Sequence, residues 1–135
     1  MKRNEPVSKI MSSDVNGVHL GQKVSEVRTL LIEKGFHHVP VLDGKEPIGI
    51  LSSTDIMRAS FGTSDDEINS TLDHTTSIED LMSKELKTID VGAPIREAAE
   101  ILSEASYHSL LVLEGKELVG IVTSTDLIRY LLAQF

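Results

Sequence analysis

Residues 41–55 read VLDGKEPIGILSSTD, and residues 112–126 read VLEGKELVGIVTSTD. Each copy consists of an apolar run, a turn that contains glycine, a second apolar run and a polar cluster that ends in aspartate. Two apolar runs around a short glycine turn are typical of a β-hairpin, because glycine adopts the positive φ that the turn needs. A hydroxyl residue three positions before an acid is typical of a helix start. The sequence therefore predicts the same strand–turn–strand–helix unit twice.

The similarity between the two halves extends well beyond these hairpins. Residues 7–62 align with residues 78–133 without a gap, at an offset of 71 positions, and 18 of the 56 pairs are identical. Two copies are too few for a solenoid, which needs about three repeats to bury its faces. The repeat indicates instead a duplicated unit whose two copies pack as a pseudo-two-fold pair.

Hydrophobic spacing adds further elements to each copy. Val24, Val27 and Leu31 recur at helical spacing, and so do their counterparts in the second copy. Each copy therefore reads β-α-β-β-α behind a short lead-in helical turn, which is an α+β fold. The predicted elements are lead-in turns at 7–11 and 78–82, first strands at 17–19 and 87–89, first helices over 24–35 and 94–105, hairpin strands at 38–42, 47–51, 109–113 and 118–122, and final helices that start after 53 and 124.

The repeat also sets the predicted domain boundaries, with one copy in 1–62 and the other in 78–135. Between them, residues 63–77 are rich in Thr, Ser and Asp, and nothing apolar organises the segment. The acidic residues Asp65, Asp66 and Glu67 could hold a metal or perform acid–base chemistry. A solvated linker explains them better, because clusters of this composition between periodic segments are typical of loops.

Composition removes several classes of protein. The chain has 135 residues, of which 40% are hydrophobic, a formal net charge of −8 and no cysteine. An acidic chain without tryptophan lacks the basic or stacking surface that nucleic-acid binding needs. Without cysteine there is no disulfide, zinc–thiolate site or thiol catalysis. No apolar run could span a bilayer and no signal peptide is visible, so we expect a cytoplasmic protein that binds neither nucleic acid nor membrane.

Two interpretations fit the polar cluster at the start of each final helix. In the first, Ser52 caps the helix and Asp55 returns a hydrogen bond to the cap, as in a capping box. In the second, free N–H groups and hydroxyl groups at the helix start bind a phosphate, and the carboxylate accepts hydrogen bonds from a ribose diol. Gly49 would then let a ligand approach the strand closely. The residues concerned are Ser52, Ser53, Thr54 and Asp55 in the first copy, and Thr123, Ser124, Thr125 and Asp126, with Gly120 matching Gly49, in the second.

The ordered set of motifs resembles the cystathionine-beta-synthase (CBS) domain, and its duplication resembles the tandem pair called a Bateman module. The resemblance covers about residues 7–134. It implies a regulatory pair with two clefts that bind adenosine derivatives, often assembled as a disc-like dimer. The residues that carry it are the Met-Ser after each lead-in turn, the Val39-Pro40-Val41 strand with its Asp-Gly turn, and the Ser/Thr-x-x-Asp cluster that follows each second hairpin strand. The two methionines, Met11 and Met82, are expected in the core or at a subunit interface.

The resemblance also implies roles for individual residues. Acidic side chains would bind the ribose, hydroxyl side chains beside them would meet ribose and phosphate, and imidazoles before the first hairpin strand would add phosphate contacts. Ser109 stands where the first copy has His38, so the second copy offers less positive charge there. The ribose-binding residues would be Asp55 and Asp126 with Ser52 and Thr123; the phosphate contacts Ser53, Thr54, Ser124, Thr125, His37, His38 and His108; and the residue near the adenine Thr88.

Three functions remain open on this basis. The first is a sensor that binds AMP, ADP or ATP, or alternatively S-adenosylmethionine, and signals through the packing of a dimer or of a partner. The second is a ligand-independent dimerisation module in which the motifs only cap helices. The third is a small enzyme, which is disfavoured because no P-loop, dinucleotide fingerprint, activated nucleophile or catalytic metal site is visible. We expect the first: a homodimeric sensor that acts on an unidentified regulated protein, with no catalytic residue, no metal site and no required cofactor.

Overall fold

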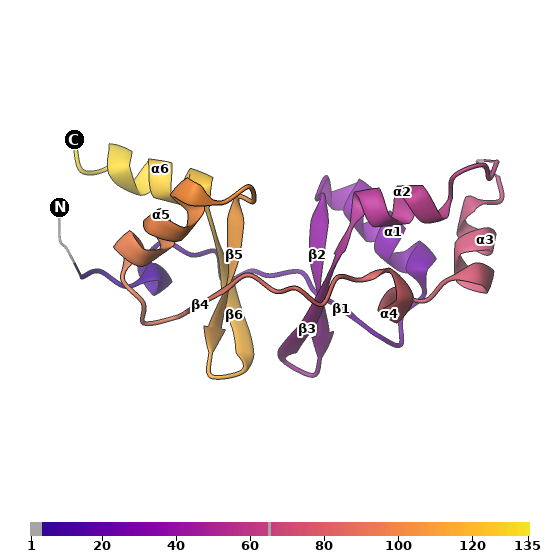
Figure 1. Ribbon diagram of the computed structural model, residues 1–135, viewed down its shortest axis with the longest axis horizontal. Helices are drawn as coiled ribbons and strands as arrows, with labels where there is room; N and C mark the ends of the chain where they lie inside the picture. The colour runs from indigo at the N-terminus through magenta and orange to yellow at the C-terminus, as the bar shows by residue number, and fades with distance from the viewer. Residues whose placement is uncertain (1–3, 65) are drawn as a thin grey trace. The chain divides into compact units, whose positions relative to one another are not determined.

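The computed structural model describes residues 4–64 and 66–135, which divide into two compact units (Figure 1). The middle unit contains residues 16–86, and the terminal unit contains the segment up to residue 15 together with residues 87–135. The two units therefore do not follow the boundaries of the sequence repeat. The lead-in segment of each copy belongs to the unit built around the other copy.

The middle unit is built on a three-stranded sheet in the order β1-β2-β3. Strand β1 (Val18–His19) is parallel to β2 (His38–Asp43), which pairs antiparallel with β3 (Glu46–Ser52). Gly44 turns the hairpin with a φ of 63°, which confirms the predicted role of a glycine with positive φ. Helices α1 (Val24–Lys34) and α2 (Ser53–Ala59) complete the predicted β-α-β-β-α order.

The core of the middle unit explains why these residues form these elements. Strand β3 alternates between buried and more exposed residues, as a strand with one covered face does. Helix α1 turns one apolar stripe towards the sheet, and it ends at Gly35, whose φ of 68° is left-handed. The buried side chains of this core are Val18, Val24, Val27, Leu31, Val39, Val41, Leu51, Ile56, Leu72 and Ile78.

The segment between the two copies is not the solvated linker that the sequence predicts. Helix α3 (Ile68–Thr75) forms there, and Leu72 is 0% exposed in the core of the middle unit. The Asp73 carboxylate accepts hydrogen bonds from the backbone N–H of Ser25 on α1 (2.9 Å) and from its Oγ (2.7 Å). Desolvation raises the pKa of Asp73, but the Ser25 hydrogen bonds and the charges of Lys23 and His74 outweigh it and lower that pKa below its ordinary value.

The acidic residues of this segment form no metal site that the structure describes. Asp66 and Glu67 are exposed, and Asp65 lies outside the described residues. Across residues 4–64 and 66–135, no three His, Asp or Glu side chains are placed to hold a metal ion together. In the same part of the chain, no helix has the length and apolar character that crossing a membrane requires.

The terminal unit repeats the same architecture. Strand β4 (Thr88–Asp90) is parallel to β5 (Ser109–Glu114), which pairs antiparallel with β6 (Glu117–Thr123). Helices α5 (Ile95–Glu104) and α6 (Ser124–Leu132) take the places of α1 and α2. Both hairpins shift register at the same point, between Val41 and Leu42 and between Val112 and Leu113. The predicted α+β fold with a duplicated unit is confirmed.

Each lead-in segment extends the sheet of the opposite copy. The turn η1 (Val7–Lys9) precedes Ser12, which forms two backbone hydrogen bonds with Ile121 of β6, 2.8 and 2.9 Å long. Helix α4 (Ile78–Leu81) likewise precedes Ser83, which forms two such bonds with Ile50 of β3, both 2.8 Å long. Figure 1 shows the indigo η1 segment beside the orange and yellow elements of the terminal unit. Each sheet is therefore completed by a segment that the sequence repeat assigns to the other copy.

Methionine side chains fill the space beside two glycines in these bridged strands. A Cβ atom on Gly49 would lie 2.5 Å from Met82 Sδ, and one on Gly120 would lie 2.5 Å from Met11 Sδ. The expectation that these glycines leave room for a ligand is therefore wrong, because a thioether occupies that room. Met82 and Met11 pack against the cores of the middle and terminal units, which confirms the predicted core role.

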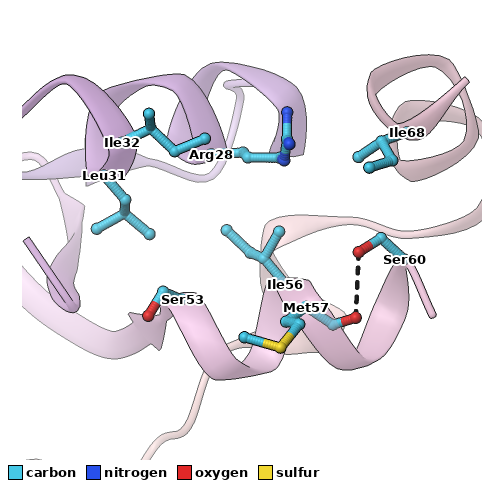
Figure 2. A pocket seen from close by; sticks show the side chains of 8 residues that line it. All are labelled: Arg28, Leu31, Ile32, Ser53, Ile56, Met57, Ser60 and Ile68. Carbon is cyan, nitrogen blue, oxygen red and sulfur yellow. Dashed lines mark hydrogen bonds between the residues drawn. The ribbon is translucent and has the colours of Figure 1, made fainter. Parts of the chain in front are cut away.

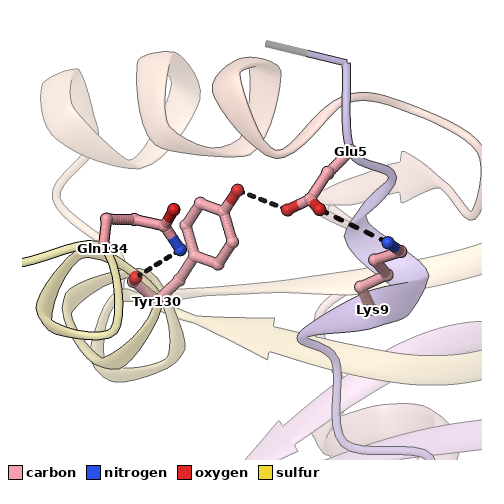
Figure 3. Close-up of polar contacts among 4 residues, drawn as sticks. All are labelled: Glu5, Lys9, Tyr130 and Gln134. Atoms are coloured by element: carbon pink, nitrogen blue, oxygen red, sulfur yellow. Dashed lines mark hydrogen bonds and ion pairs between the residues drawn. The ribbon is translucent and has the colours of Figure 1, made fainter. Parts of the chain in front are cut away.

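The N-terminal segment is also tied to the last helix of the terminal unit (Figure 3). Tyr130 on α6 donates a hydrogen bond from its hydroxyl to Glu5 Oε2, and Lys9 Nζ donates to Glu5 Oε1 over 3.3 Å. The hydrogen bond to Glu5, followed by desolvation and the charge of Glu5, raises the pKa of Tyr130. These contacts at Glu5 therefore hold the lead-in segment against the second copy at a second point, in addition to the β-bridge at Ser12.

Candidate functional site

A complete capping box stands at the start of both α2 and α6. In α2, the Asp55 N–H donates to Ser52 Oγ (3.1 Å), and Asp55 Oδ2 accepts from the Ser52 N–H (3.1 Å) and Oγ (2.8 Å). In α6, the Asp126 N–H donates to Thr123 Oγ1 (3.1 Å), and Asp126 Oδ2 accepts from the Thr123 N–H (2.8 Å). The capping interpretation is confirmed, and the boxes fix the orientation of both carboxylates.

The capping boxes occupy only one oxygen of each carboxylate. In the described part of the chain, Asp55 Oδ1 and Asp126 Oδ1 have no hydrogen-bond partner, although both residues are half-buried. An ionised carboxylate has two acceptor oxygens with about four lone-pair sites. Each aspartate therefore combines a fixed position with an unused acceptor atom. Helix capping and ligand binding are thus compatible at these residues.

The helix starts offer fewer N–H groups than a phosphate cradle would use. The Ser53 N–H donates to His37 O and the Ser124 N–H to His108 O, each over 2.9 Å. The capping hydroxyls occupy the N–H groups of the two aspartates. In the first turns as the structure describes them, this leaves the N–H groups of Thr54 and Thr125 without a partner, and both threonines are exposed. Phosphate binding here would therefore depend mainly on side chains.

The structure brings the predicted histidines next to the capping boxes. His38 begins β2 and lies directly opposite Ser52 in the hairpin register, and His37 precedes it. In the terminal unit, Ser109 lies opposite Thr123 and His108 precedes it. All three imidazoles are exposed. The difference between His38 and Ser109 thus falls at the same place in the two copies, beside the capping hydroxyl.

Thr88 and the first residues of the two final helices occupy different settings. Thr88 is exposed at the start of β4, one strand away from β6, where it pairs with Leu111 of β5. Ser124 Oγ donates to His108 O over 3.4 Å, whereas Ser53 lines a pocket in the middle unit. The structure therefore places the capping-box residues of each unit beside the histidines at the start of the hairpin. Thr88 stands apart from them on β4, which is separated from β6 by β5.

A pocket of about 260 Å³ lies among the helices of the middle unit (Figure 2). In Figure 2, α1 and α2 form opposite walls, and Ile68 at the start of α3 closes one end. Among the predicted site residues only Ser53 reaches it, and the sequence prediction missed the pocket because it assigned no helix to residues 68–75. The pocket is lined by Arg28, Leu31, Ile32, Ser53, Ile56, Met57, Ser60 and Ile68.

Comparison with protein families matches both halves of the chain. The model of the CBS domain matches residues 7–62 and again residues 78–133. Among curated proteins, the uncharacterized protein MJ1404 of Methanocaldococcus jannaschii is 26% identical over 138 residues. The aligned region covers 96% of this chain and 32% of MJ1404. The chain spans less than half the length of each of the first curated relatives it matches. Some of those longer relatives are named as enzymes, such as homoserine O-acetyltransferase.

Solved structures share the fold over nearly the whole chain. The structure of CBSX2 in complex with AMP has a TM-score of 0.77 at 24% identity, and covers 96% of this chain and 97% of that one. The CBS domain pair of protein MJ0100, in complex with 5-methylthioadenosine and S-adenosyl-L-methionine, has a TM-score of 0.74 at 24% identity, and covers 97% and 98%. At these identities the likeness shows the fold.

Proposed function

This chain belongs to the CBS domain family as a tandem pair, and from that premise we propose that it is a regulatory module that binds an adenine nucleotide, AMP, ADP or ATP. The observation that supports this most directly is the half-used carboxylate of each capping box. Asp55 and Asp126 are oriented by Oδ2, and each keeps Oδ1 free to accept hydrogen bonds from ribose hydroxyls. The solved pairs of similar fold hold AMP in one case and two adenosine derivatives in the other.

The surrounding residues supply the remaining chemistry of the proposed sites. Exposed threonines one position before each aspartate, Thr54 and Thr125, offer a hydroxyl and a free N–H to a phosphate. The imidazoles of His37, His38 and His108 add donors near the same helix starts, and Thr88 is the proposed adenine neighbour. Because His38 is replaced by Ser109 in the second copy, we expect nucleotides with more phosphates to prefer the middle unit.

The proposed module acts on another protein rather than catalysing a reaction. CBS pairs are generally regulatory, and in the longer relatives the matching region is a minor part of the whole. Binding changes a partner only to the extent that the ligand prefers one of two conformations. The proposed partner is therefore a regulated protein or a second copy whose packing depends on the occupied site.

A second function, that of a dimerisation module, is favoured by the exposed face of α6. Apolar residues recur on and just after this helix with the spacing of one helical stripe, and Leu132 and Phe135 are 65% and 96% exposed. Such a stripe on a small acidic protein favours association with another surface. We therefore include a homodimer in the proposal. For the ligand, S-adenosylmethionine is the alternative to an adenine nucleotide. The stripe consists of Ile128, Leu131, Leu132 and Phe135.

Calorimetric titration of the chain with AMP, ADP, ATP and S-adenosylmethionine tests the proposal. Asp55→Asn and Asp126→Asn are the informative variants, because the amide oxygen can still accept from the capping N–H while an NH₂ group replaces the free Oδ1. Loss of a hydrogen bond to a charged group is worth about 1.5–3 kcal/mol, so Kd should rise at least about tenfold. Asp80→Asn is the matched control, since Asp80 holds the same position after the Ser77 cap of α4.

The outcomes separate the competing functions. If folded protein binds none of the four ligands, the sensor proposal fails and the dimerisation module remains. If a nucleotide binds but neither Asn variant weakens it, the ligand lies elsewhere than the capping boxes. If S-adenosylmethionine alone binds, the module senses that ligand. Sedimentation of Leu132→Glu, with and without nucleotide, then tells whether association depends on the α6 stripe.

A further inference from the structure

The pocket among α1, α2 and α3 contains a cation without a counter-ion. Arg28 is half-buried there, and its Nη1 donates a hydrogen bond to Asn69 Oδ1 over 3.1 Å. Within residues 4–64 and 66–135, no acidic side chain forms an ion pair with this guanidinium. Several other described basic side chains also form no ion pair, but among the residues that line this pocket Arg28 is the one that carries a charge. An anion that enters from solvent would supply the missing partner.

The guanidinium is held in place by the helix that the sequence did not predict. Asn69 lies on α3, and α3 is fixed to the core by the buried Leu72. The two hydrogen bonds from Ser25 to Asp73 join α3 to the start of α1, the helix that carries Arg28. A charged group supported in this way is preorganised for a ligand, because its orientation does not have to be fixed on binding.

The remaining walls limit the size and character of a ligand. Five of the eight lining residues are apolar, and Figure 2 shows Leu31 of α1 and Ile56 of α2 pointing into the space between the two helices. The volume of about 260 Å³ is below the usual range of drug-sized ligand sites, about 300–1,000 Å³. A short apolar group with one charged end fits this volume and composition. The apolar residues are Leu31, Ile32, Ile56, Met57 and Ile68.

The duplication did not produce this pocket twice. The residues that match Arg28 and Ser60 in the second copy, 71 positions later, are Ala99 and Leu131. Helix α3, which contributes Ile68 to the pocket, lies in the segment between the two matched copies. The two copies thus share the capping aspartates but not the cation, which separates this pocket from the duplicated nucleotide sites.

We propose that the pocket of the middle unit binds a small organic monocarboxylate, with its carboxylate on Arg28 and its apolar tail between α1 and α2. A guanidinium matches a carboxylate with two parallel hydrogen bonds. Removal of the apolar tail from water adds a second favourable contribution. The inference does not rest on nucleotide binding, although Ser53 belongs to both the pocket and the proposed phosphate contacts.

Titration of the full chain with hexanoate and benzoate, followed by calorimetry and by ligand-observed NMR, tests this inference. Hexanamide has the same tail without the charge, and inorganic phosphate has a charge without a tail. Hexanoate and benzoate should bind at least about tenfold more tightly than either comparison compound, since a hydrogen bond to a charged group is worth about one to two powers of ten in affinity. Failure of both carboxylates to bind, or equal binding of hexanamide, would overturn the proposal.

Two variants assign the binding to this pocket. Arg28→Gln should weaken hexanoate by about tenfold to a hundredfold, while Arg96→Gln, on an exposed helix face of the terminal unit, should leave it unchanged. If circular dichroism shows that Arg28→Gln is unfolded, Ser60→Leu takes its place. This variant introduces the residue found in the second copy, and its larger side chain should block the tail of the ligand. Hexanoate binding that survives both pocket variants would contradict the assignment.

The remaining occupant to distinguish is a second copy of the chain. If sedimentation shows a dimer that Met57→Lys dissociates, and carboxylates neither bind nor shift that equilibrium, a neighbouring chain fills the pocket and the proposal is wrong. Asp126→Asn separates this test from the nucleotide proposal, because it lies in the other unit. Weaker nucleotide binding at the site of the terminal unit in that variant, with hexanoate binding retained, would show that the carboxylate site does not depend on that nucleotide site.

Discussion

Alanine in place of Gly120 or Gly49 would test whether Met11 and Met82 pack tightly against the strands that the lead-in segments join. The added Cβ on Gly120 would lie 2.5 Å from Met11 Sδ and 2.9 Å from Ser12 O. On Gly49, the corresponding distances are 2.5 Å to Met82 Sδ and 3.1 Å to Ser83 O. Neither glycine has a positive φ, so the backbone tolerates alanine and the whole effect comes from overlap with these neighbours.

The two substitutions should differ in the size of their effect, because the carbonyl oxygen beside Gly120 lies closer to the added Cβ than the one beside Gly49. An overpacked methylene typically costs about 1–3 kcal/mol. A methionine can rotate away at modest cost, but both carbonyl oxygens are held, Ser12 O by a hydrogen bond of 2.9 Å from Ile121 and Ser83 O by one of 2.8 Å from Ile50. The closer approach of the new Cβ to Ser12 O, 2.9 Å against 3.1 Å to Ser83 O, therefore decides the order. We therefore expect Gly49→Ala to lower the free energy of unfolding by about 1 kcal/mol and Gly120→Ala by about 3 kcal/mol.

Urea denaturation followed by far-UV circular dichroism measures both values, and a double-mutant cycle identifies the cause. Removing the methionine side chain with Met82→Ala should abolish most of the cost of Gly49→Ala, which gives a coupling energy of at least about 0.5 kcal/mol. Met11→Ala should relieve Gly120→Ala only in part, because Ser12 O remains. The reasoning fails if Gly49→Ala is as stable as the wild type, if the cycle shows no coupling, or if Gly120→Ala is the milder change.

Three further predictions concern contacts outside these sheets. Leu72→Ala should lower the free energy of unfolding by about 2–5 kcal/mol in urea denaturation; a value under about 0.5 kcal/mol, typical of a surface residue, would mean that α3 is not anchored. Asp73→Asn should lower the urea midpoint at neutral pH, and this deficit should shrink below about pH 4. The lowered pKa of Asp73 means that its carboxylate stabilises the fold above the pKa of the unfolded chain, and this stabilisation is lost as the pH falls through the pKa of the folded state. A deficit that does not change with pH would refute this explanation. Tyr130→Phe should accelerate amide hydrogen exchange in residues 5–12, measured by mass spectrometry against Tyr107→Phe, and unchanged rates would show that the hydrogen bond to Glu5 does not hold the segment.

The hairpins and helix caps could be predicted because their determinants are local. Gly44 and Gly115 supply the positive φ of each turn, and a hydroxyl residue three positions before an acid caps each final helix. Helix α3 could not be predicted, because Leu72 is its one buried residue and a single leucine among polar residues gives no helical periodicity. The exchange of the lead-in segments was also invisible, because periodicity reports what an element is and not which sheet it joins.

The candidate site was predictable in its residues but not in its geometry. Spacing alone pointed to Asp55 and Asp126, yet only coordinates reveal that one oxygen of each is engaged and the other is not. The N–H groups expected for phosphate are partly taken by the carbonyl groups of His37 and His108, which requires knowledge of the hairpin register. Arg28 gave no signal at all, because its neighbour Asn69 belongs to the unpredicted helix.

The reciprocal placement of the lead-in segments has a consequence for how such a chain can have originated. A protein with only one copy would have a single lead-in segment, and that segment, in the arrangement seen here, belongs on the sheet of a different copy. In the same arrangement, such an ancestor would cover its sheet edge by trading segments with another molecule, as domain-swapped dimers do. Fusion of two genes would have made the trade internal to one polypeptide, where tethering replaces diffusion and raises the effective concentration of each segment to about the millimolar range.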